Sequence, residues 1–197
     1  MHKSKAGIAF VILGAVLIGS ALLLFAYNRA EDETAGRQAD AALEELQSKI
    51  GEAGETENGM TLAEVEGYEY IGYLEIPAID RTLPVLADWD ELRLSFGPCR
   101  QFGSTKTDDL VIAAHNFKNH FGLLSELEPG DAVRFTDMDG EETDYEVVKT
   151  ATLQPTDVEA VQNSGHDLVL YTCTYGGKTR VTVFCDRTEE QEEETNE

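Results

Sequence analysis

The chain begins with a long apolar stretch before any alternating pattern appears. Residues 6–27 carry no charged side chain, and as a helix they rise about 33 Å, enough to cross the hydrocarbon core of a bilayer. Lys3 and Lys5 precede this stretch, and an acidic run follows it from Glu31. The pattern predicts a transmembrane signal anchor over residues 6–27, with residues 1–5 in the cytoplasm and everything after the anchor outside the cell.

A cleaved signal peptide is the alternative interpretation of this stretch. Asn28, Arg29 and Ala30 do not form the small-x-small pattern of a cleavage site, and the apolar run is longer than a usual signal-peptide core. The sequence therefore favours an uncleaved, single-pass anchor in the cell membrane with an extracellular domain.

The segment after the anchor is acidic. Residues 31–66 hold 11 acidic and 2 basic side chains. Residues 37–50 combine good helix formers with apolar positions at helical spacing, whereas residues 51–59 are rich in glycine and acid. We predict a stalk and linker over residues 28–67, with folded structure from about Tyr68.

From Tyr70 onward, the apolar positions alternate or form short runs, as in β-strands. Asp139-Gly140 marks a hairpin between two of the runs. Roughly eight short strands in about 120 residues favour an all-β closed barrel over a parallel sheet. Strands are predicted over residues 70–76, 83–86, 110–115, 132–136, 143–148 and 150–153 and on both sides of Gly176, and short helical segments over residues 90–94, 119–127 and 158–161.

Residues 168–184 are typical of two strands joined at Gly176-Gly177, a two-residue turn signal. This register pairs Cys173 with Arg180 on one face, with Cβ atoms about 5 Å apart. A neighbouring cation favours the thiolate, which is the nucleophilic form of cysteine. Because an arginine is costly to bury beside a core thiol, the pairing favours a reactive cysteine over one that only packs.

A thiolate nucleophile usually needs a histidine to protonate the leaving amine. His2 is predicted on the cytoplasmic side, His120 lies in a polar stretch and is predicted at the surface, and His166 lies in a loop. His115 ends a buried apolar strand. It is the favoured acid, because a barrel carries function at the ends of its strands.

The other two cysteines, Cys99 and Cys185, are too few for a disulfide framework. Their pairing is the only disulfide that leaves Cys173 free. Geometry decides whether it forms, so the sequence leaves this open.

The formal net charge of −23 is unevenly distributed. Residues 67–187 hold 21 acidic and 10 basic side chains, and residues 188–197, an acidic C-terminal tail, hold 6 acidic and none basic. With no basic stripe, nucleic acid is not an expected partner, and the anchor is the only expected membrane contact. We predict no cofactor and no metal site. One group of acids could ligate calcium, namely Asp137, Asp139, Glu141 and Glu142. We interpret this group as a solvated hairpin tip.

In this order, the motifs resemble those of the sortase family, the membrane-anchored cysteine transpeptidases of Gram-positive bacteria. The resemblance covers about Tyr70 to Arg187 and implies a sortase catalytic domain over residues 68–187. The matching pieces are Tyr70-Ile-Gly-Tyr-Leu-Glu-Ile-Pro-Ala-Ile and Leu83-Pro-Val85 in the opening strands, Ala114-His115-Asn116 at the histidine motif, Leu170-Tyr-Thr-Cys173 at the cysteine signature, and Arg180 at the start of the next strand.

The resemblance implies an eight-stranded barrel that cleaves a C-terminal sorting signal of secreted proteins. Cys173 would attack the scissile carbonyl to form a thioacyl-enzyme, and an amine from a cell-wall precursor or a pilin would resolve it. His115 would protonate the leaving amine and deprotonate the incoming one, and Arg180 would stabilise the oxyanion or hold the substrate backbone. Thr172 and Thr174 flank the thiol and are candidate substrate contacts, although strand propensity also explains them.

Some residues depart from the family pattern, so the subclass stays open. Val169 stands where the signature usually has a threonine, and Ala114 where a glycine often precedes the histidine. Between Thr156 and Leu168 there is no room for the long helix of class B members. No C-terminal membrane segment is present and no aromatic lid motif precedes Tyr68, which argues against the pilin-polymerising class.

Two other functions are compatible with the sequence. A cysteine hydrolase, or thiol protease, on the same site would let water replace the amine. A non-catalytic, surface-anchored β domain would bind a partner, and it predicts that Cys173, His115 and Arg180 do not converge in space.

Overall fold

The computed structural model describes residues 5–52 and 54–188, and the chain divides into two units, Met1–Thr34 and Ala35–Glu197. The first unit is helical and forms most of α1 (Lys5–Ser48). This helix contains a stretch long and apolar enough to span a membrane, as predicted. The predicted orientation across the membrane stays a prediction. Residues 1–4, and the predicted tail after Thr188, lie outside the described residues.

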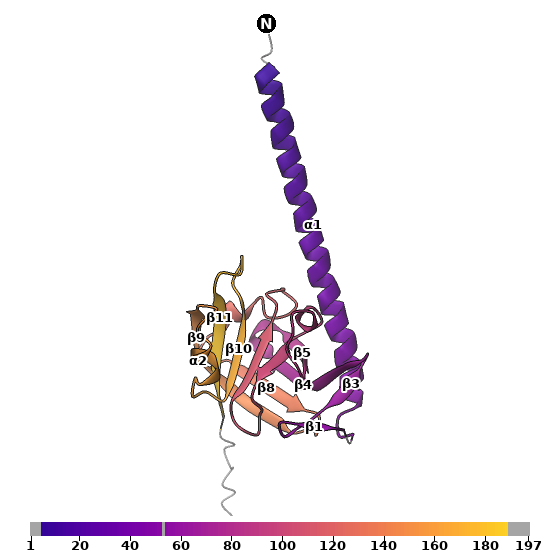
Figure 1. Cartoon of the computed structure of the whole chain (residues 1–197), viewed down its shortest axis with the longest axis vertical. Helices are drawn as coiled ribbons and strands as arrows, with labels where there is room; N and C mark the ends of the chain where they lie inside the picture. The colour runs from indigo at the N-terminus through magenta and orange to yellow at the C-terminus, as the bar shows by residue number, and fades with distance from the viewer. Residues whose placement is uncertain (1–4, 53, 189–197) are drawn as a thin grey trace, which may run out of the picture. The chain divides into compact units, whose positions relative to one another are not determined.

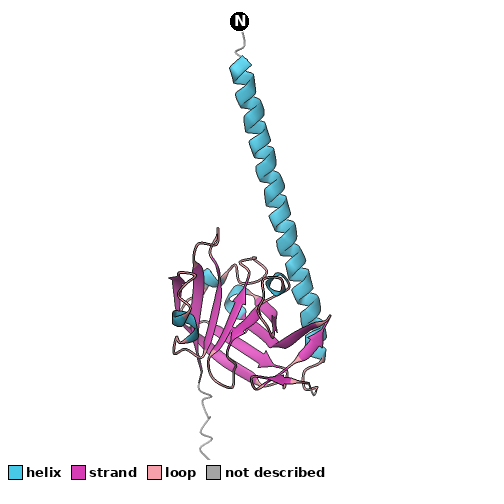
Figure 2. Cartoon of the chain, in the orientation of Figure 1, coloured by secondary structure: helices cyan, strands magenta, loops and turns pink. Residues whose placement is uncertain are grey.

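The second unit is a closed eight-stranded barrel (Figures 1 and 2). Its strands follow the order β4-β5-β6-β7-β10-β11-β9-β8, and β4 pairs with β8 to close the ring. Strand β3 adds to the edge of β4, and β1 and β2 form a separate hairpin. The bounds are β1 Thr56–Glu57, β2 Met60–Thr61, β3 Ala63–Val65, β4 Tyr68–Ile76, β5 Arg81–Leu86, β6 Cys99–Phe102, β7 Leu110–Ala114, β8 Ala132–Asp137, β9 Glu142–Leu153, β10 Leu168–Cys173 and β11 Arg180–Arg187, with short helices η1 Pro77–Ile79, η2 Arg93–Ser95, η3 Leu124–Glu126 and α2 Glu159–Gln162.

The barrel closes through a close approach of backbones at Gly72. Strand β4 pairs with β5 and β8 through this residue, which faces Val85 on one side and Asp137 on the other. Gly72 has a φ of 146°, and a Cβ here would lie 2.1 Å from the carbonyl oxygen of Thr136. Only glycine fits this position without displacing β8.

The central strands are buried on both faces, which explains their continuous apolar runs. In β7 and β10, Leu110, Ile112, Leu168 and Leu170 belong to the core inside the barrel. The alternate residues of these strands face outward and pack with Phe184 in a second layer beside α2. The outward face of these strands is also the face on which the predicted site lies.

The folded unit begins well before Tyr68, contrary to the prediction of a stalk and linker up to that residue. Helical spacing places Ala35, Ala39, Ala42 and Leu46 on one buried face of α1, and Met60 is also fully buried. The sequence pattern did not reveal this packing, because the acidic residues of the segment, which lie on the exposed face of the helix, made it read as a solvated stalk. The C-terminal end of α1 therefore contributes to the core of the domain.

The predicted strands are all present, but the four strands β1, β2, β3 and β6 were not predicted, and one predicted helix is shorter. Strand β6 was not predicted, because it is short and has a bulge between Arg100 and Phe102 that disturbs the alternation. The helix predicted over residues 119–127 is only the single turn η3. Residues 150–153 extend the strand predicted over residues 143–148, as expected, and the two form β9.

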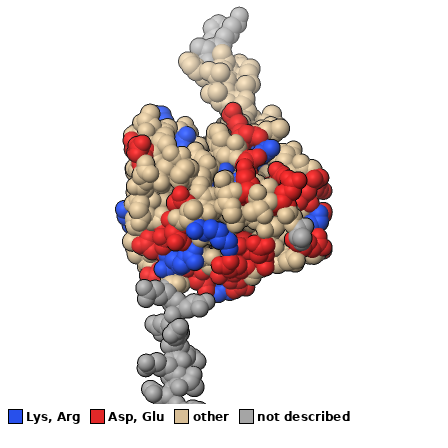
Figure 3. All heavy atoms as spheres, turned by 60° about the horizontal axis from the view of Figure 1, so that its bottom comes forward, with Lys and Arg blue, Asp and Glu red and all other residues tan. Residues whose placement is uncertain are grey.

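Acidic side chains cover more of the face drawn in Figure 3 than basic ones. Two basic residues of this unit, Arg134 and Lys106, pair with acidic neighbours. Arg134 of β8 pairs with Glu142 and Asp144 of β9, at 2.9 and 2.6 Å. Lys106 pairs with Asp137, at 3.2 Å, and with Glu141. The fourth acid of the group considered for calcium, Asp139, accepts a hydrogen bond from Thr61. All four acids therefore have partners within the protein.

Candidate active site

Three neighbouring strands bring the predicted catalytic residues together. Strands β7 and β10 are parallel with Ala114 opposite Thr172, so the next residues, His115 and Cys173, lie beside each other where the two strands end. On its other side, Cys173 lies directly opposite Arg180 of β11. The order across the sheet is therefore His115, Cys173 and Arg180, all on the outward face.

Burial distinguishes Cys173 from the other two cysteines. All three lie in the described part of the chain and are free thiols, and only Cys173 is partly exposed. Cys99 and Cys185 lie in different core clusters, which separates the one pair that the sequence left open as a disulfide. Burial raises the pKa of each of these two thiols to about 12. They stay protonated at neutral pH, and Cys173 is the thiol available for chemistry.

The predicted pairing of Cys173 with Arg180 is confirmed, but the turn is longer than two residues. Strand β10 ends at Cys173, and Gly177 donates a backbone hydrogen bond of 2.8 Å to the Thr174 carbonyl, closing a turn around Gly176. The Arg180 guanidinium donates from Nη1 to the carbonyls of Gly177 and Thr179, both at 3.1 Å. The turn carbonyls thus anchor the guanidinium of Arg180, whose backbone lies opposite Cys173.

The two threonines beside the thiol use their hydroxyls within the protein. Thr172 is 3% exposed and donates to the Ala114 carbonyl at 2.8 Å, which ties β10 to β7 next to His115. The Thr174 and Thr179 hydroxyls lie 2.9 Å apart across the turn. These bonds position the site, and the substrate contact predicted for Thr172 and Thr174 stays a prediction.

The loop after β7 folds back on His115. Phe121 donates a backbone hydrogen bond of 3.2 Å to the His115 carbonyl, and the Phe117 ring lies 5.1 Å from the imidazole, between centroids. His120, predicted at the surface, is instead fully buried, with its ring 5.5 Å from that of Phe117. The prediction was wrong because the chain turns inward at His120, while Lys118 of the same stretch stays exposed.

His166 lies at the opposite end of the strands from the thiol. It precedes β10, whose last residue is Cys173, and its Nδ1 lies 2.7 Å from a carboxylate oxygen of Asp186. Of the three histidines in the domain, His115 is therefore the one beside Cys173.

The comparison with known families agrees with this geometry. The model of the sortase domain matches residues 74–188, more than half of the chain. The chain belongs to the sortase family.

Solved sortase structures resemble this sortase over most of their length. Sortase C1 from Streptococcus suis is 30% identical, with 64% of this chain and 77% of that chain covered and a TM-score of 0.55. Streptococcus pneumoniae sortase C is 27% identical, with 81% and 89% covered and a TM-score of 0.57. A Clostridium perfringens sortase D5 transpeptidase shares the fold at 19% identity, with 78% and 99% covered and a TM-score of 0.61. The search of curated proteins finds no match.

A cleft of about 170 Å³ lies beside Arg180, one of the three candidate catalytic residues. Tyr171 and Arg180 form part of its wall, with Trp89 and Gln101 on one side and α2 with the end of β9 on the other. Tyr171 donates a hydrogen bond of 2.7 Å to Gln101. Burial raises the pKa of Tyr171 to about 12, against the opposing effect of Arg180, so the phenol stays a neutral donor.

The sequence analysis did not single out these cleft residues. Tyr171 had a usable signal, because it precedes Cys173 by two positions and must share its face of the strand. Gln101 had no such signal, because it lies at the bulge of β6, which the sequence pattern does not reveal. Trp89 lies in a loop, whose position depends on the folded barrel.

Proposed function

We propose that this sortase is a cysteine transpeptidase that cleaves a C-terminal sorting signal of secreted proteins and joins them to an amine on the cell surface. The observation that carries the proposal is the alignment of His115, Cys173 and Arg180 on three adjacent strands. A non-catalytic β domain would give these residues no reason to converge.

In the first step, the Cys173 thiolate attacks the scissile carbonyl carbon. The C–N bond then breaks, His115 gives a proton to the leaving amine, and the N-terminal part of the substrate stays on sulfur as a thioester. Arg180, which lies opposite Cys173 in the sheet and is anchored by the turn carbonyls, supplies a positive donor for the oxyanion.

In the second step, an amine attacks the thioester and His115 takes its proton. A new amide bond forms, the C–S bond breaks, and Cys173 returns as thiolate. No cofactor enters this balance, since the thioester conserves the acyl group between the two steps.

The cleft beside Arg180 is suited to the peptide whose carbonyl is attacked. Tyr171 and Trp89 offer aromatic surface, and Gln101 and Arg180 offer polar contacts to a peptide backbone. A pilin or a cell-wall precursor is the proposed source of the amine. The similarity to the S. pneumoniae enzyme, whose structure is described in terms of pilin substrate specificity, supports the pilin.

The acyl-enzyme tests the function directly. The full chain in detergent is incubated with a library of peptides that carry C-terminal sorting signals, and the adduct is located by mass spectrometry after digestion. We expect an acyl group on the peptide that contains Cys173, and none in Cys173→Ala. An adduct on another residue, or no adduct, would contradict the proposal.

The fate of the acyl group separates transfer from hydrolysis. The same reaction is run with and without glycylglycine as the amine. A new amide product with the amine supports a transpeptidase, whereas the free acid in both reactions would identify a hydrolase on the same residues.

A further inference from the structure

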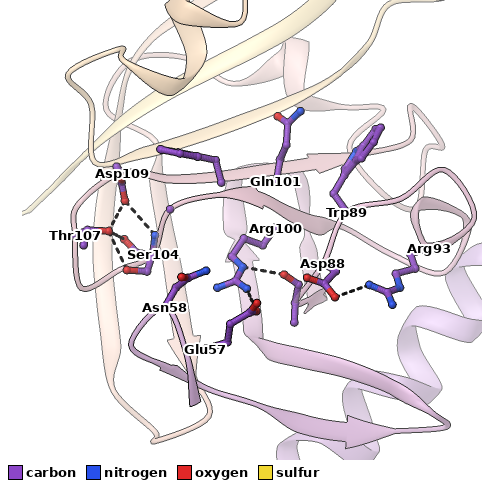
Figure 4. Close-up of a pocket in the computed structure, with 13 residues that line it drawn as sticks. Glu57, Asn58, Asp88, Trp89, Arg93, Arg100, Gln101, Ser104, Thr107 and Asp109 are labelled. Carbon is purple, nitrogen blue, oxygen red and sulfur yellow. Dashed lines mark hydrogen bonds and ion pairs between the residues drawn. The ribbon is translucent and has the colours of Figure 1, made fainter. Parts of the chain in front are cut away.

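A larger cavity, of about 820 Å³, lies next to the cleft of the active site (Figure 4). The β1–β2 hairpin, the loop after β5, and β6 with its following loop form its walls. The catalytic mechanism uses none of the charged residues in this cavity. Those labelled in Figure 4 are Glu57, Asp88, Arg93, Arg100 and Asp109.

Arg100 is the feature that points to a ligand. Its side chain is only 4% exposed and projects from β6 toward Glu57, as Figure 4 shows. Nε donates to the Ala87 carbonyl at 2.8 Å, and Nη2 pairs with one oxygen of Glu57. Nη1 is buried and has no hydrogen-bond partner among the described residues. A guanidinium fork can hold both oxygens of a carboxylate, so this arginine is only half used.

The other charges of the cavity are satisfied differently. Arg93 pairs with Asp88 at 2.8 Å, and Asp109 accepts hydrogen bonds from the Ser104 backbone and the Thr107 hydroxyl. A buried, incompletely bonded cation is costly unless it has another use. Arg100 is therefore the charged group of this cavity that has a buried, unused donor.

Glu57 is a partner that a ligand can displace. It lies on a two-residue strand, and its side chain is 48% exposed. It contacts Arg100 through one carboxylate oxygen only. A carboxylate that enters the cavity can replace it and use both sides of the fork, while Glu57 returns to water at little cost.

The cavity also shares two wall residues with the cleft beside Arg180. Trp89 and Gln101 line both the large cavity and the cleft that contains Arg180. A peptide held at Arg100 can therefore extend past these two residues toward Cys173.

We propose that the Arg100 cavity binds a carboxylate of a peptide substrate, in competition with Glu57. The identity of this peptide rests on the proposed function, since either the sorting signal or the amine acceptor can carry the carboxylate. The anion site itself does not depend on catalysis.

Binding is measured with Trp89, which is the only tryptophan of the chain and lines the cavity. The full-length Cys173→Ala protein in detergent is titrated with glycylglycine or glycylglycinamide, which differ in the free carboxylate. We expect saturable quenching or enhancement with glycylglycine and an affinity about tenfold lower for the amide, as for the loss of a charge-assisted hydrogen bond. Equal affinity for the two probes would overturn the proposal.

Two variants separate a binding site from a structural ion pair. Arg100→Gln should remove the preference for the carboxylate, whereas Glu57→Gln should strengthen glycylglycine binding severalfold, because the competing carboxylate is gone. An ion pair that serves only stability predicts that neither variant tightens binding, and unchanged or weaker binding in Glu57→Gln would overturn the proposal. This variant also serves if Arg100→Gln fails to fold. Arg134→Gln, a paired surface arginine on β8, is the matched control and should bind as the parent does.

The kinetics of the Arg100→Gln variant that retains Cys173 identify which substrate carries the carboxylate. If the acceptor supplies it, Arg100→Gln raises the KM for glycylglycine and leaves thioacyl formation unchanged. If the sorting peptide supplies it, thioacyl formation falls instead, most for peptides with an acidic residue near the scissile bond. A change in neither step would limit the site to free ligands and overturn a role for substrate carboxylates. Failure of transpeptidation with intact binding would count against the proposed function alone.

Discussion

At the scale of single residues, the environment of each thiol decides its chemistry. Cys99 and Cys185 are enclosed by apolar side chains, while Cys173 lies between a histidine and an arginine at the end of its strand. The same side chain is thus a packing element at two positions and a candidate nucleophile at the third.

We expect iodoacetamide at pH 8 to modify Cys173 alone in the folded protein, with Cys99 and Cys185 reacting only after denaturation. Their pKa of about 12 leaves few thiolates at this pH, and burial blocks access. Mass spectrometry of digested protein checks this. Cys173→Ala should lose labelling and turnover, whereas Cys99→Ala should keep most activity. Turnover in Cys173→Ala would contradict the assignment.

The two buried thiols also predict a loss of stability at alkaline pH. Their folded pKa of about 12 exceeds the ordinary value of 9.0, so the unfolded chain releases these protons first as the pH rises. Their contribution is complete below pH 9 and decreases up to about pH 12. Urea unfolding at pH 8 and 10.5 should show a smaller decrease in Cys185→Ala than in the parent, and an equal decrease would contradict the shift.

Arg180 acts by geometry as well as charge. Lysine keeps the charge but loses the planar fork that the carbonyls of Gly177 and Thr179 orient. We expect Arg180→Lys to lose roughly a hundredfold in turnover, the usual effect of a missing oxyanion donor, while Cys173 still reacts with iodoacetamide. Steady-state kinetics measures the loss. Turnover near that of the parent would mean that charge alone suffices.

At the scale of strands, the closure of the barrel depends on Gly72. In Gly72→Ala, the added methyl group would collide with the backbone of β8, which should lower the free energy of unfolding by about 1–3 kcal/mol or more. Gly165→Ala is the matched control, because Gly165 also has a positive φ, of 74°, but no atom within 4 Å of its Cβ position. Urea unfolding should show a larger loss for Gly72→Ala, and equal losses would contradict the steric account.

At the scale of the whole molecule, α1 is one continuous helix whose apolar stretch is long enough to span a membrane and whose C-terminal end packs in the core of the domain. Deleting residues 1–30 should give a soluble, active protein, because it keeps Ala35, Ala39, Ala42 and Leu46. Deleting residues 1–50 should lower the free energy of unfolding by at least about 2–5 kcal/mol, the usual cost of losing one buried leucine side chain. Urea unfolding compares the two proteins. Equal stability would show that α1 does not support the barrel.

The sequence by itself determined the local elements and the chemistry that they carry. The apolar run of residues 6–27, the strand patterns and the pairing of Cys173 with Arg180 depend on period, turn residues and neighbouring positions. These interactions join residues that are close in sequence, so local sequence patterns predict them. The motifs around His115 and Cys173 then indicated the family.

Only the tertiary structure decided which distant segments meet. The burial of His120 and Met60, the place of Leu46 in the core, and the half-used fork of Arg100 result from segments far apart in sequence. Such contacts depend on how the barrel closes and on a bulge in β6, and no local pattern encodes either. The candidate site residues could therefore be proposed from the sequence, whereas the cavities beside them required the folded chain.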